Sequence, residues 1–548
     1  MKISKKWESL WLAAFVFIML SALPQYADWY QKNEKIDILK YSFSFKLNEE
    51  NDMVVAETTI QARVLGSDQK ELTLDFAASQ EGRGFEVLAV YDGNEPAPFS
   101  RNNDKLLIRF VQPALAGEEK TLRVAYRGIP KDGLIIGPNL YGEKMFCGDN
   151  WPERARCWLP VVDHPYDKAQ CEFIIDAPEK YQVIANGILQ ERSSLPGGRV
   201  LTRWLEEKPI PTKVMVMAAG RFANEFYRSD DGYSLETWVY PQDREPGFAI
   251  FHASGKSVDF FSALIAPLPY PKLAHVQSKT VQGGMENAGC IFYYEKVARA
   301  EKSREGLIVH ETAHQWFGDS VSEKDWNHIW ISEGFATYFS AVYFEKTHGA
   351  EQLPQIMKEE RDDVFRYAAA HPDARIVDER RMTSQGLLST NTYQKGAWVL
   401  HMLRELLGDE VFFRAVREYY RKFAHGNVVS ADFQQAVEKI SGQALGWFFK
   451  QWLYQPGYPQ FAGSWKYSKK KQAIAFDMRQ IQKNGCLFSV PLQLALYKKD
   501  QAEPAMITIQ LSRRHERITS KTDFEPERIV ADPLVKLLAE VNLGKGKR

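Results

Sequence analysis

The feature that most constrains the fold of this chain is a pair of histidines, His310 and His314, with Glu311 directly after the first. Residues four apart on an α-helix lie about 40° from each other, so both imidazoles project from one face and can bind one metal ion. Glu311 lies about 100° round the helix from His310, where it can reach a water molecule on that metal and act as a general base. We therefore expect a buried helix over residues 305–317 that ends at Gly318.

A third metal ligand, Glu333, follows His314 by nineteen residues. An unbroken helix would carry it about 28 Å away, so the chain must turn back. The break at residues 318–320 permits this reversal, and residues 330–338 predict a second helix that returns Glu333 to the histidines. Two histidines, one carboxylate and an open fourth position are typical of a catalytic rather than a structural zinc site. We expect one zinc ion per chain.

The residues around these ligands are more specific than a bare His-Glu-x-x-His pattern, which also occurs in proteins without metal. Residues 310–318 (HETAHQWFG), the spacing to Glu333 and residues 330–336 (WISEGFA) resemble the zinc signature of the aminopeptidase N family of gluzincin metallopeptidases, which includes leukotriene hydrolase. The resemblance implies a zinc-dependent aminopeptidase with a thermolysin-like α/β catalytic domain.

A glycine-rich segment that lies 24 residues before His310 is similar to the family's Gly-x-Met-Glu-Asn motif. Alone, it could be an ordinary turn. The resemblance implies that Glu286 pairs with the substrate's N-terminal ammonium group and sets the cleavage register. Paired glycines would also let an extended substrate approach this edge. The expected substrate-binding residues are Gly283, Gly284, Met285, Glu286 and Asn287.

Two further positions follow from the resemblance. Tyr393 stands in a Tyr-x-Lys-Gly segment, which implies that it donates a hydrogen bond to the tetrahedral intermediate, although a tyrosine at a helix start usually serves packing. The family also has a Glu or Gln that helps to hold the amine, before a block that matches residues 155–169. Residues 146–153 depart from that form, so Asp149 or Asn150 is either the replacement or a turn residue.

The first 27 residues predict export. Lys2, Lys5 and Lys6 precede an apolar run at residues 10–20 and then Pro24, which is typical of a signal peptide. The run is shorter than the roughly 20 residues that span a bilayer, so we expect a periplasmic or extracellular protein, with an uncleaved N-terminal anchor as the alternative. The five cysteines are an odd number, so at least one thiol would be free and the pairing stays open.

Composition and periodicity indicate a multidomain α+β protein. The chain has 548 residues, 45% of them apolar, and its 70 basic and 70 acidic residues cancel, so no charge excess indicates a nucleic-acid partner. Alternating strands and turn signals predict an antiparallel β domain at 28–225. Helical patterns place the zinc peptidase domain at 226–457, and strands return in a small β-sandwich at 458–548.

The metal-binding pattern predicts a zinc enzyme, and the family resemblance implies a zinc aminopeptidase that hydrolyses the N-terminal peptide bond of peptides. If Glu286 were only structural, a zinc endopeptidase of broader specificity would be the alternative, and a catalytically silent binding protein with the same fold is a less favoured one. The expected partners are peptide substrates, with no nucleic acid and with membrane contact only through the N-terminal segment. Many family members continue into a large helical domain that closes over the site, so we expect a more open cleft here.

Overall fold

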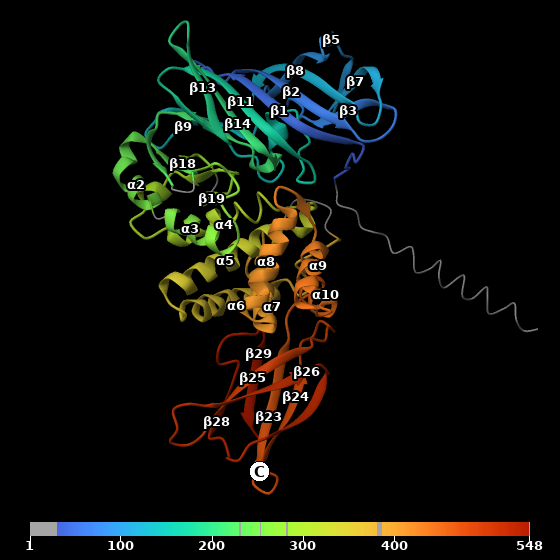
Figure 1. Ribbon diagram of the computed structural model, residues 1–548, viewed down its shortest axis with the longest axis vertical. Helices are drawn as coiled ribbons and strands as arrows, with labels where there is room; N and C mark the ends of the chain where they lie inside the picture. Colours follow the sequence, from blue (N-terminus) through green and yellow to red (C-terminus); the bar gives the residue numbers. More distant parts are fainter. Residues whose placement is uncertain (1–29, 230–231, 253, 281–282, 381–385, 547–548) are drawn as a thin grey trace, which may run out of the picture.

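The computed structural model describes residues 30–229, 232–252, 254–280, 283–380 and 386–546. The predicted signal segment at 1–27 lies outside them. Two β-rich regions occupy the two ends of the molecule, and a helical region lies between them (Figure 1). Within the described ranges, no helix is both long and apolar enough to cross a membrane.

The N-terminal region is built on an eight-stranded sheet with two smaller sheets beside it. The large sheet has, in order, β13 (Ile188–Leu195), β14 (Arg199–Pro211), β11 (Lys168–Pro178), β1 (Ile36–Lys46), β2 (Val54–Val64), β8 (Glu119–Ile129), β4 (Gly84–Asp92) and β5 (Glu95–Pro96). The smaller sheets are β12 (Gln182–Ala185), β15 (Met217–Gly220), β10 (Lys144–Gly148) and β9 (Leu134–Pro138), and β3 (Gln69–Asp75), β7 (Lys105–Ala114) and β6 (Phe99–Asn102). Buried and exposed residues alternate along β2, as expected for a sheet with one face in the core.

One pair in this region is not antiparallel. β1 and β11 run parallel, with Phe43 opposite Phe173. The expectation of a purely antiparallel domain is therefore wrong at this pair. A parallel pair needs a long connection rather than a hairpin, and most of the N-terminal region lies between these two strands in the sequence.

The helical region combines a five-stranded sheet with nine numbered α-helices in the described ranges. The sheet has the order β16 (Ala223–Arg228), β17 (Ser234–Val239), β18 (Lys272–Ser278), β20 (Cys290–Tyr294) and β19 (Gly284–Met285). The helices are α2 (Arg244–His252), α3 (Ser254–Leu264), α4 (Glu305–Ala313), α5 (Trp330–His348), α6 (Gln352–Ala370), α7 (Gly396–Leu407), α8 (Asp409–Phe423), α9 (Ser430–Ser441) and α10 (Gly446–Tyr454). The short strands β21 (Ser322–Glu323) and β22 (Asn427–Val428) pair beside them. The helices α2 and α3 lie between the strands β17 and β18 in the sequence.

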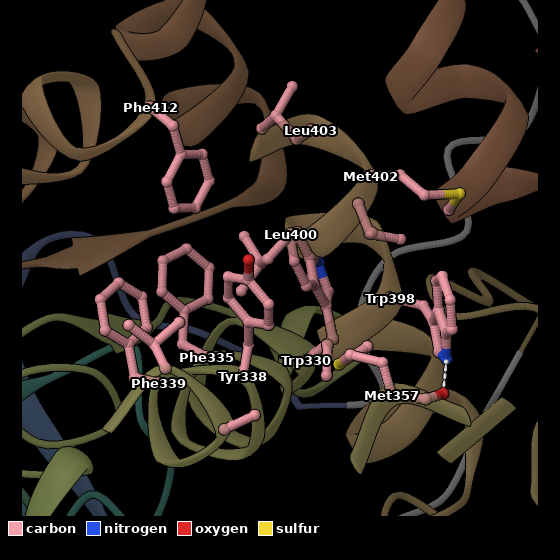
Figure 2. Packing of buried hydrophobic residues seen from close by; sticks show 14 of the residues in the cluster. Trp330, Phe335, Tyr338, Phe339, Met357, Trp398, Leu400, Met402, Leu403 and Phe412 are labelled. Atoms are coloured by element: carbon pink, nitrogen blue, oxygen red, sulfur yellow. Dashed lines mark hydrogen bonds between the residues drawn. The ribbon is translucent and has the colours of Figure 1, made fainter. Parts of the chain in front are cut away.

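Aromatic side chains from α5, α7 and α8 pack together in the core of the helical region (Figure 2). Trp330, Phe335 and Tyr338 of α5 are fully buried among them. The indole of Trp398 in α7 donates a hydrogen bond to the Met357 carbonyl oxygen of α6 (3.1 Å). This packing fixes α5, which carries Glu333, relative to α7 and the turn before it.

Strands return after residue 459 in two small sheets. One has the order β27 (His515–Lys521), β24 (Ala473–Gln480), β23 (Gln460–Ser468) and β29 (Glu540–Lys545), and the other has β26 (Ala505–Leu511), β25 (Val490–Tyr497) and β28 (Arg528–Ala531). Their buried residues belong to the same apolar core as the helices, so the C-terminal β region packs firmly on the helical region. The boundaries expected at residues 225 and 457 stay predictions.

Candidate metal centre

The structure brings the three predicted ligands together. One ligand atom from each of His310, His314 and Glu333 lies within 4.8 Å of the others. The two imidazole Nε2 atoms are 3.1 Å apart, and Glu333 Oε2 lies 3.6 Å from His310 Nε2 and 3.4 Å from His314 Nε2. His310 is on α4, His314 directly follows that helix, and Glu333 is in the first turn of α5.

The first helix ends four residues earlier than the sequence predicts. α4 stops at Ala313, although the His314 amide still bonds to the His310 carbonyl oxygen (3.3 Å) and keeps the one-turn spacing. Gly318 follows with φ +130°, and a Cβ there would overlap Ser332 Oγ and lie 2.8 Å from His314 Nδ1. Glycine is therefore needed because the returning α5 passes close to the ligand, and not only because it stops a helix.

His314 is oriented by partners on its second ring nitrogen. Nδ1 lies 3.1 Å from the Phe317 carbonyl oxygen and 3.1 Å from Ser332 Oγ. Because a carbonyl oxygen only accepts, Nδ1 carries the hydrogen in the neutral ring and Nε2 keeps its lone pair for a metal. Residue spacing did not indicate a role for Ser332, although it stands beside Glu333 in the segment that resembles the zinc signature.

The residues present fit a zinc ion. Two imidazole nitrogens and one carboxylate oxygen form a donor set that zinc prefers, and Glu333 Oε2 is buried and accepts no hydrogen bond from any described residue. Burial opposes a charge on His314, but the surrounding carboxylates, Glu333 first and then Glu286 and Glu311, raise the pKa of His314 to about 10. These carboxylates therefore stabilise positive charge on the His314 ring.

Two more carboxylates lie beside these ligands. Glu286, Glu311 and His314 form a second group whose ligand atoms lie within 4.8 Å of one another. Burial raises the pKa of Glu311 to about 8. Glu286 is 5% exposed, and its Oε1 has no hydrogen-bond partner among the described residues. A buried carboxylate without a partner is costly unless a ligand supplies one.

The predicted glycine-rich segment lies at a sheet edge and close to Glu311. Gly284 and Met285 form β19, the last strand of the five-stranded sheet. A Cβ on Gly284 would lie 2.5 Å from Glu311 Oε1, so this backbone passes directly against the carboxylate. Gly283 has φ +96°, and Met285 and Asn287 are buried. The two residues before Gly283 lie outside the described ranges.

Gln315 holds this segment against the metal-binding helix. Its side-chain amide donates to the Glu286 carbonyl oxygen (3.1 Å), and its oxygen accepts from the Gly289 amide (2.8 Å). Both contacts fix the loop that carries Glu286 relative to His314, the neighbour of Gln315. Residue spacing did not indicate this role for Gln315 either, although Gln315 stands inside the segment that resembles the zinc signature.

Tyr393 lies beside His310. Its ring stacks on the His310 ring at 6.1 Å and 19°, and it sits in a π-helical turn, η6 (Asn391–Lys395), that leads into α7. Burial and the charges of nearby carboxylates, Glu333 first, raise the pKa of Tyr393, so the phenol keeps its proton. Gly334 and Gly396 let α5 and this turn touch, because a Cβ on Gly334 would lie 2.9 Å from the Gly396 Cα.

Asp149 and Asn150 are both buried and bonded within the protein. The Asn150 amide donates to the Thr212 carbonyl oxygen (3.0 Å), and its oxygen accepts from Trp158 Nε1 (2.7 Å). Asp149 pairs with Arg154 and accepts a hydrogen bond from Thr280 Oγ1 (3.0 Å). Asn150 is therefore engaged at both ends of its carboxamide.

All five cysteines, Cys147, Cys157, Cys171, Cys290 and Cys486, are free thiols.

Two protein-family models match this chain, one over the N-terminal β region and one over the helical region. The Peptidase M1 N-terminal domain matches residues 38–214, and the Peptidase family M1 domain matches residues 251–452, which contain the three ligands. The chain belongs to peptidase family M1. Membership agrees with the α+β architecture, in which an N-terminal β region precedes a helical region and further strands.

Several aminopeptidases are similar in sequence to part of this chain. Aminopeptidase M1-A of Oryza sativa subsp. japonica is 29% identical over 379 residues, which are 65% of this chain and 42% of that protein. Leucyl aminopeptidase of Saccharolobus solfataricus is 25% identical over 470 residues, 79% of this chain and 56% of that protein. The chain spans about half the length of the curated relatives it matches.

A solved structure has the same fold. A crystal structure of a mutant M1 zinc metallopeptidase from Deinococcus radiodurans superposes with a TM-score of 0.68 at 20% sequence identity. The superposition covers 78% of this chain and 97% of that chain.

Proposed function

We propose that this M1 peptidase is a zinc-dependent aminopeptidase that hydrolyses the N-terminal peptide bond of peptides. The observation that carries the proposal is the unpartnered carboxylate of Glu286, buried beside Glu311 and the three ligand side chains. A carboxylate at this distance from the metal centre is suited to bind the free ammonium group of a substrate. The names of the relatives, which include leucyl and glutamyl aminopeptidases, support the same activity.

His310, His314 and Glu333 would hold the zinc ion. When bound, zinc polarises the scissile carbonyl and makes an attacking water more acidic. Glu311 accepts the proton of that water on its carboxylate and passes it to the nitrogen of the leaving amine. Tyr393 donates a hydrogen bond from Oη to the carbonyl oxygen as that oxygen gains charge, a contribution of about 3 kcal/mol.

The segment Gly283 to Asn287 would bind the substrate's N-terminal end. Glu286 pairs with the ammonium group, and this contact sets the cleavage register so that one residue is released per cycle. The backbone of β19 lies at a sheet edge, where an extended peptide can add main-chain hydrogen bonds. Gly284 lets that backbone approach Glu311.

The aminopeptidase activity is tested with an amino-acid anilide before and after N-acetylation. We expect the zinc-loaded protein to hydrolyse the free amine and to lose nearly all activity on the acetylated compound, because Glu286 then has no ammonium partner. Equal rates on both compounds would exclude an aminopeptidase and leave the zinc endopeptidase. The Glu311→Gln variant separates an enzyme from a silent binding protein, since an enzyme loses turnover while it retains zinc.

We also propose the finer organisation that the sequence predicts. The helical region at 226–457 would be a thermolysin-like catalytic domain, and the strands at 458–548 would form a small β-sandwich on it. The two C-terminal sheets and their shared core support this division. Export would depend on residues 1–27.

A further inference from the structure

Lys395, the last residue of the π-helical turn that carries Tyr393, is buried to 1% exposure. Its Nζ donates a hydrogen bond to the Gln455 carbonyl oxygen (3.3 Å), directly after α10. Burial lowers the pKa of Lys395 to about 7. An apolar side chain could fill this position without the cost of burying an amine. What the lysine provides, and an apolar residue would not, is the hydrogen bond to Gln455.

The segment that Lys395 binds is held by the C-terminal β region. Asn484, in the connection between β24 and β25, donates to the Pro456 carbonyl oxygen (2.9 Å). Asn484 is itself fixed, because its side-chain oxygen accepts from the Cys486 amide (3.1 Å). A Cβ on Gly457 would lie 2.6 Å from Asn484 Nδ2, so the two segments are in close contact. Gln455 therefore lies directly before the segment, Pro456 and Gly457, that the C-terminal β region contacts through Asn484.

The same turn is fixed on its other sides by the helices. Gly396, the first residue of α7, packs directly after the turn on Gly334 of α5. The Lys395 amide bonds to the Thr390 carbonyl oxygen (2.9 Å), which closes the wide turn. Single π-helical turns are rare and often lie at functional sites, where they aim a side chain. Here the turn aims Tyr393, two residues before Lys395.

We propose that Lys395 is a positioning residue that ties the Tyr393 turn, through Gln455, to the C-terminal β region. This inference depends on the proposed function, since it assigns the link a role in the same reaction. Tyr393 must place its Oη within hydrogen-bond distance of one oxygen atom, and a shift of about 1 Å can cost about 100-fold in rate. The C-terminal β region thereby contributes to turnover without reaching the metal centre.

The first test is the Lys395→Met variant, which keeps an unbranched side chain but removes the donor. We expect kcat of the zinc-loaded enzyme to fall by about 10- to 100-fold, with KM within about twofold and zinc content unchanged. Lys450→Met removes an exposed lysine from the neighbouring α10 and should leave both constants unchanged. If Lys395→Met does not fold, Asn484→Ala loosens the same link and should lower kcat in the same direction.

The second test asks whether the loss acts through Tyr393. In a Tyr393→Phe background, Lys395→Met should change kcat by less than about twofold, because the group that it positions is already absent. Amide hydrogen exchange over residues 391–396 should also become faster in Lys395→Met, a readout that needs no activity. Equal losses in both backgrounds, or unchanged exchange, would overturn the inference. No hydrolysis by the zinc-loaded wild type would instead refute the proposed function, and the exchange would still test the link.

Discussion

In the candidate active site, the Gly284 backbone passes close to the side chain of Glu311. A Cβ at Gly284 would lie 2.5 Å from Glu311 Oε1, so Gly284→Ala must displace either the strand or the carboxylate. We expect kcat to fall at least about tenfold, because a general base works only at hydrogen-bond distance from its proton. Zinc content should not change, since no ligand is touched. Steady-state kinetics and metal analysis measure both.

Gly137→Ala is the matched control for this prediction. Gly137 lies in β9, and nothing lies within 4 Å of an added Cβ. This variant should keep wild-type kinetics. A Gly284→Ala enzyme with normal kcat would contradict the close approach.

The sequence predicted the residues whose roles follow from spacing along the chain. His310, His314 and Glu311 depend on one helical turn, and Glu333 depends on a reversal that a glycine break signals. Ser332 and Gln315 could not be assigned because their roles depend on which atoms they meet after the chain has turned back. Those contacts are tertiary, and spacing alone does not specify them.

At the scale of helices, Gly334 brings α5 against Gly396, the first residue of α7, and against the Tyr393 turn directly before it. A Cβ in a Gly334→Ala variant would lie 2.9 Å from the Gly396 Cα and 3.2 Å from the Thr392 carbonyl oxygen. Both neighbours are backbone, so the elements must separate, at a cost of about 1–3 kcal/mol. We expect a lower apparent melting temperature together with a lower kcat, because Glu333 and Tyr393 lie on the two displaced elements.

Gly306→Ala in α4 is the control for a helical glycine. The nearest atom to its added Cβ is 3.9 Å away, which is ordinary van der Waals contact. Alanine there should stabilise the protein by about 0.5–1 kcal/mol through its higher helix propensity. If Gly334→Ala behaved in the same way, the contact between the two glycines would not be tight.

A buried histidine in β18 predicts a loss of stability in acid. Burial lowers the pKa of His275 from 6.5 to about 3, and its Nε2 has no partner among the described residues. Between these values the unfolded chain binds a proton that the folded chain does not. Stability therefore falls as the pH drops from 6.5 towards 3, by about 1.4 kcal/mol for each pH unit.

This prediction is checked with urea unfolding of the metal-free protein between pH 6.5 and 4, so that release of zinc does not contribute. His275→Gln should show a shallower decline in the urea midpoint than the wild type. His252→Gln removes an exposed histidine at the end of α2 and should keep the wild-type decline. Parallel curves for wild type and His275→Gln would contradict the assignment.

Periodicity predicted most strands and helices, because one buried face determines each of them. It did not predict that β1 and β11 run parallel, because alternation along a strand does not specify the direction of its partner. The early end of α4 was missed for a similar reason. Residues 314–317 follow α4 and keep helix-like backbone hydrogen bonds, although they are not part of the regular helix. The position of Gly318 is determined by its contact with α5.

At the scale of the whole molecule, the N-terminal β region supports the loop that follows the metal-binding helix. Lys168 Nζ, at the start of β11, donates to the carbonyl oxygens of Asp319 (3.0 Å) and Ser320 (2.8 Å). Lys213 pairs with Glu323 at 2.6 Å, and both side chains are fully buried. These contacts join two regions that lie far apart in the sequence, at the reversal that returns Glu333 to the histidines.

The buried Lys213–Glu323 ion pair should contribute to the stability of the whole molecule. Lys213→Met would leave the Glu323 carboxylate buried and unpaired, which costs about 3–5 kcal/mol, so the apparent melting temperature should fall by roughly 5–10 °C. The double variant Lys213→Met/Glu323→Gln removes both charges and should recover most of that loss. Arg63→Met breaks an exposed pair with Glu119 (2.9 Å) and should change the melting temperature by about 1 °C or less, because solvent screens such pairs. A double variant as unstable as Lys213→Met would show that packing, and not the unpaired charge, determines the loss.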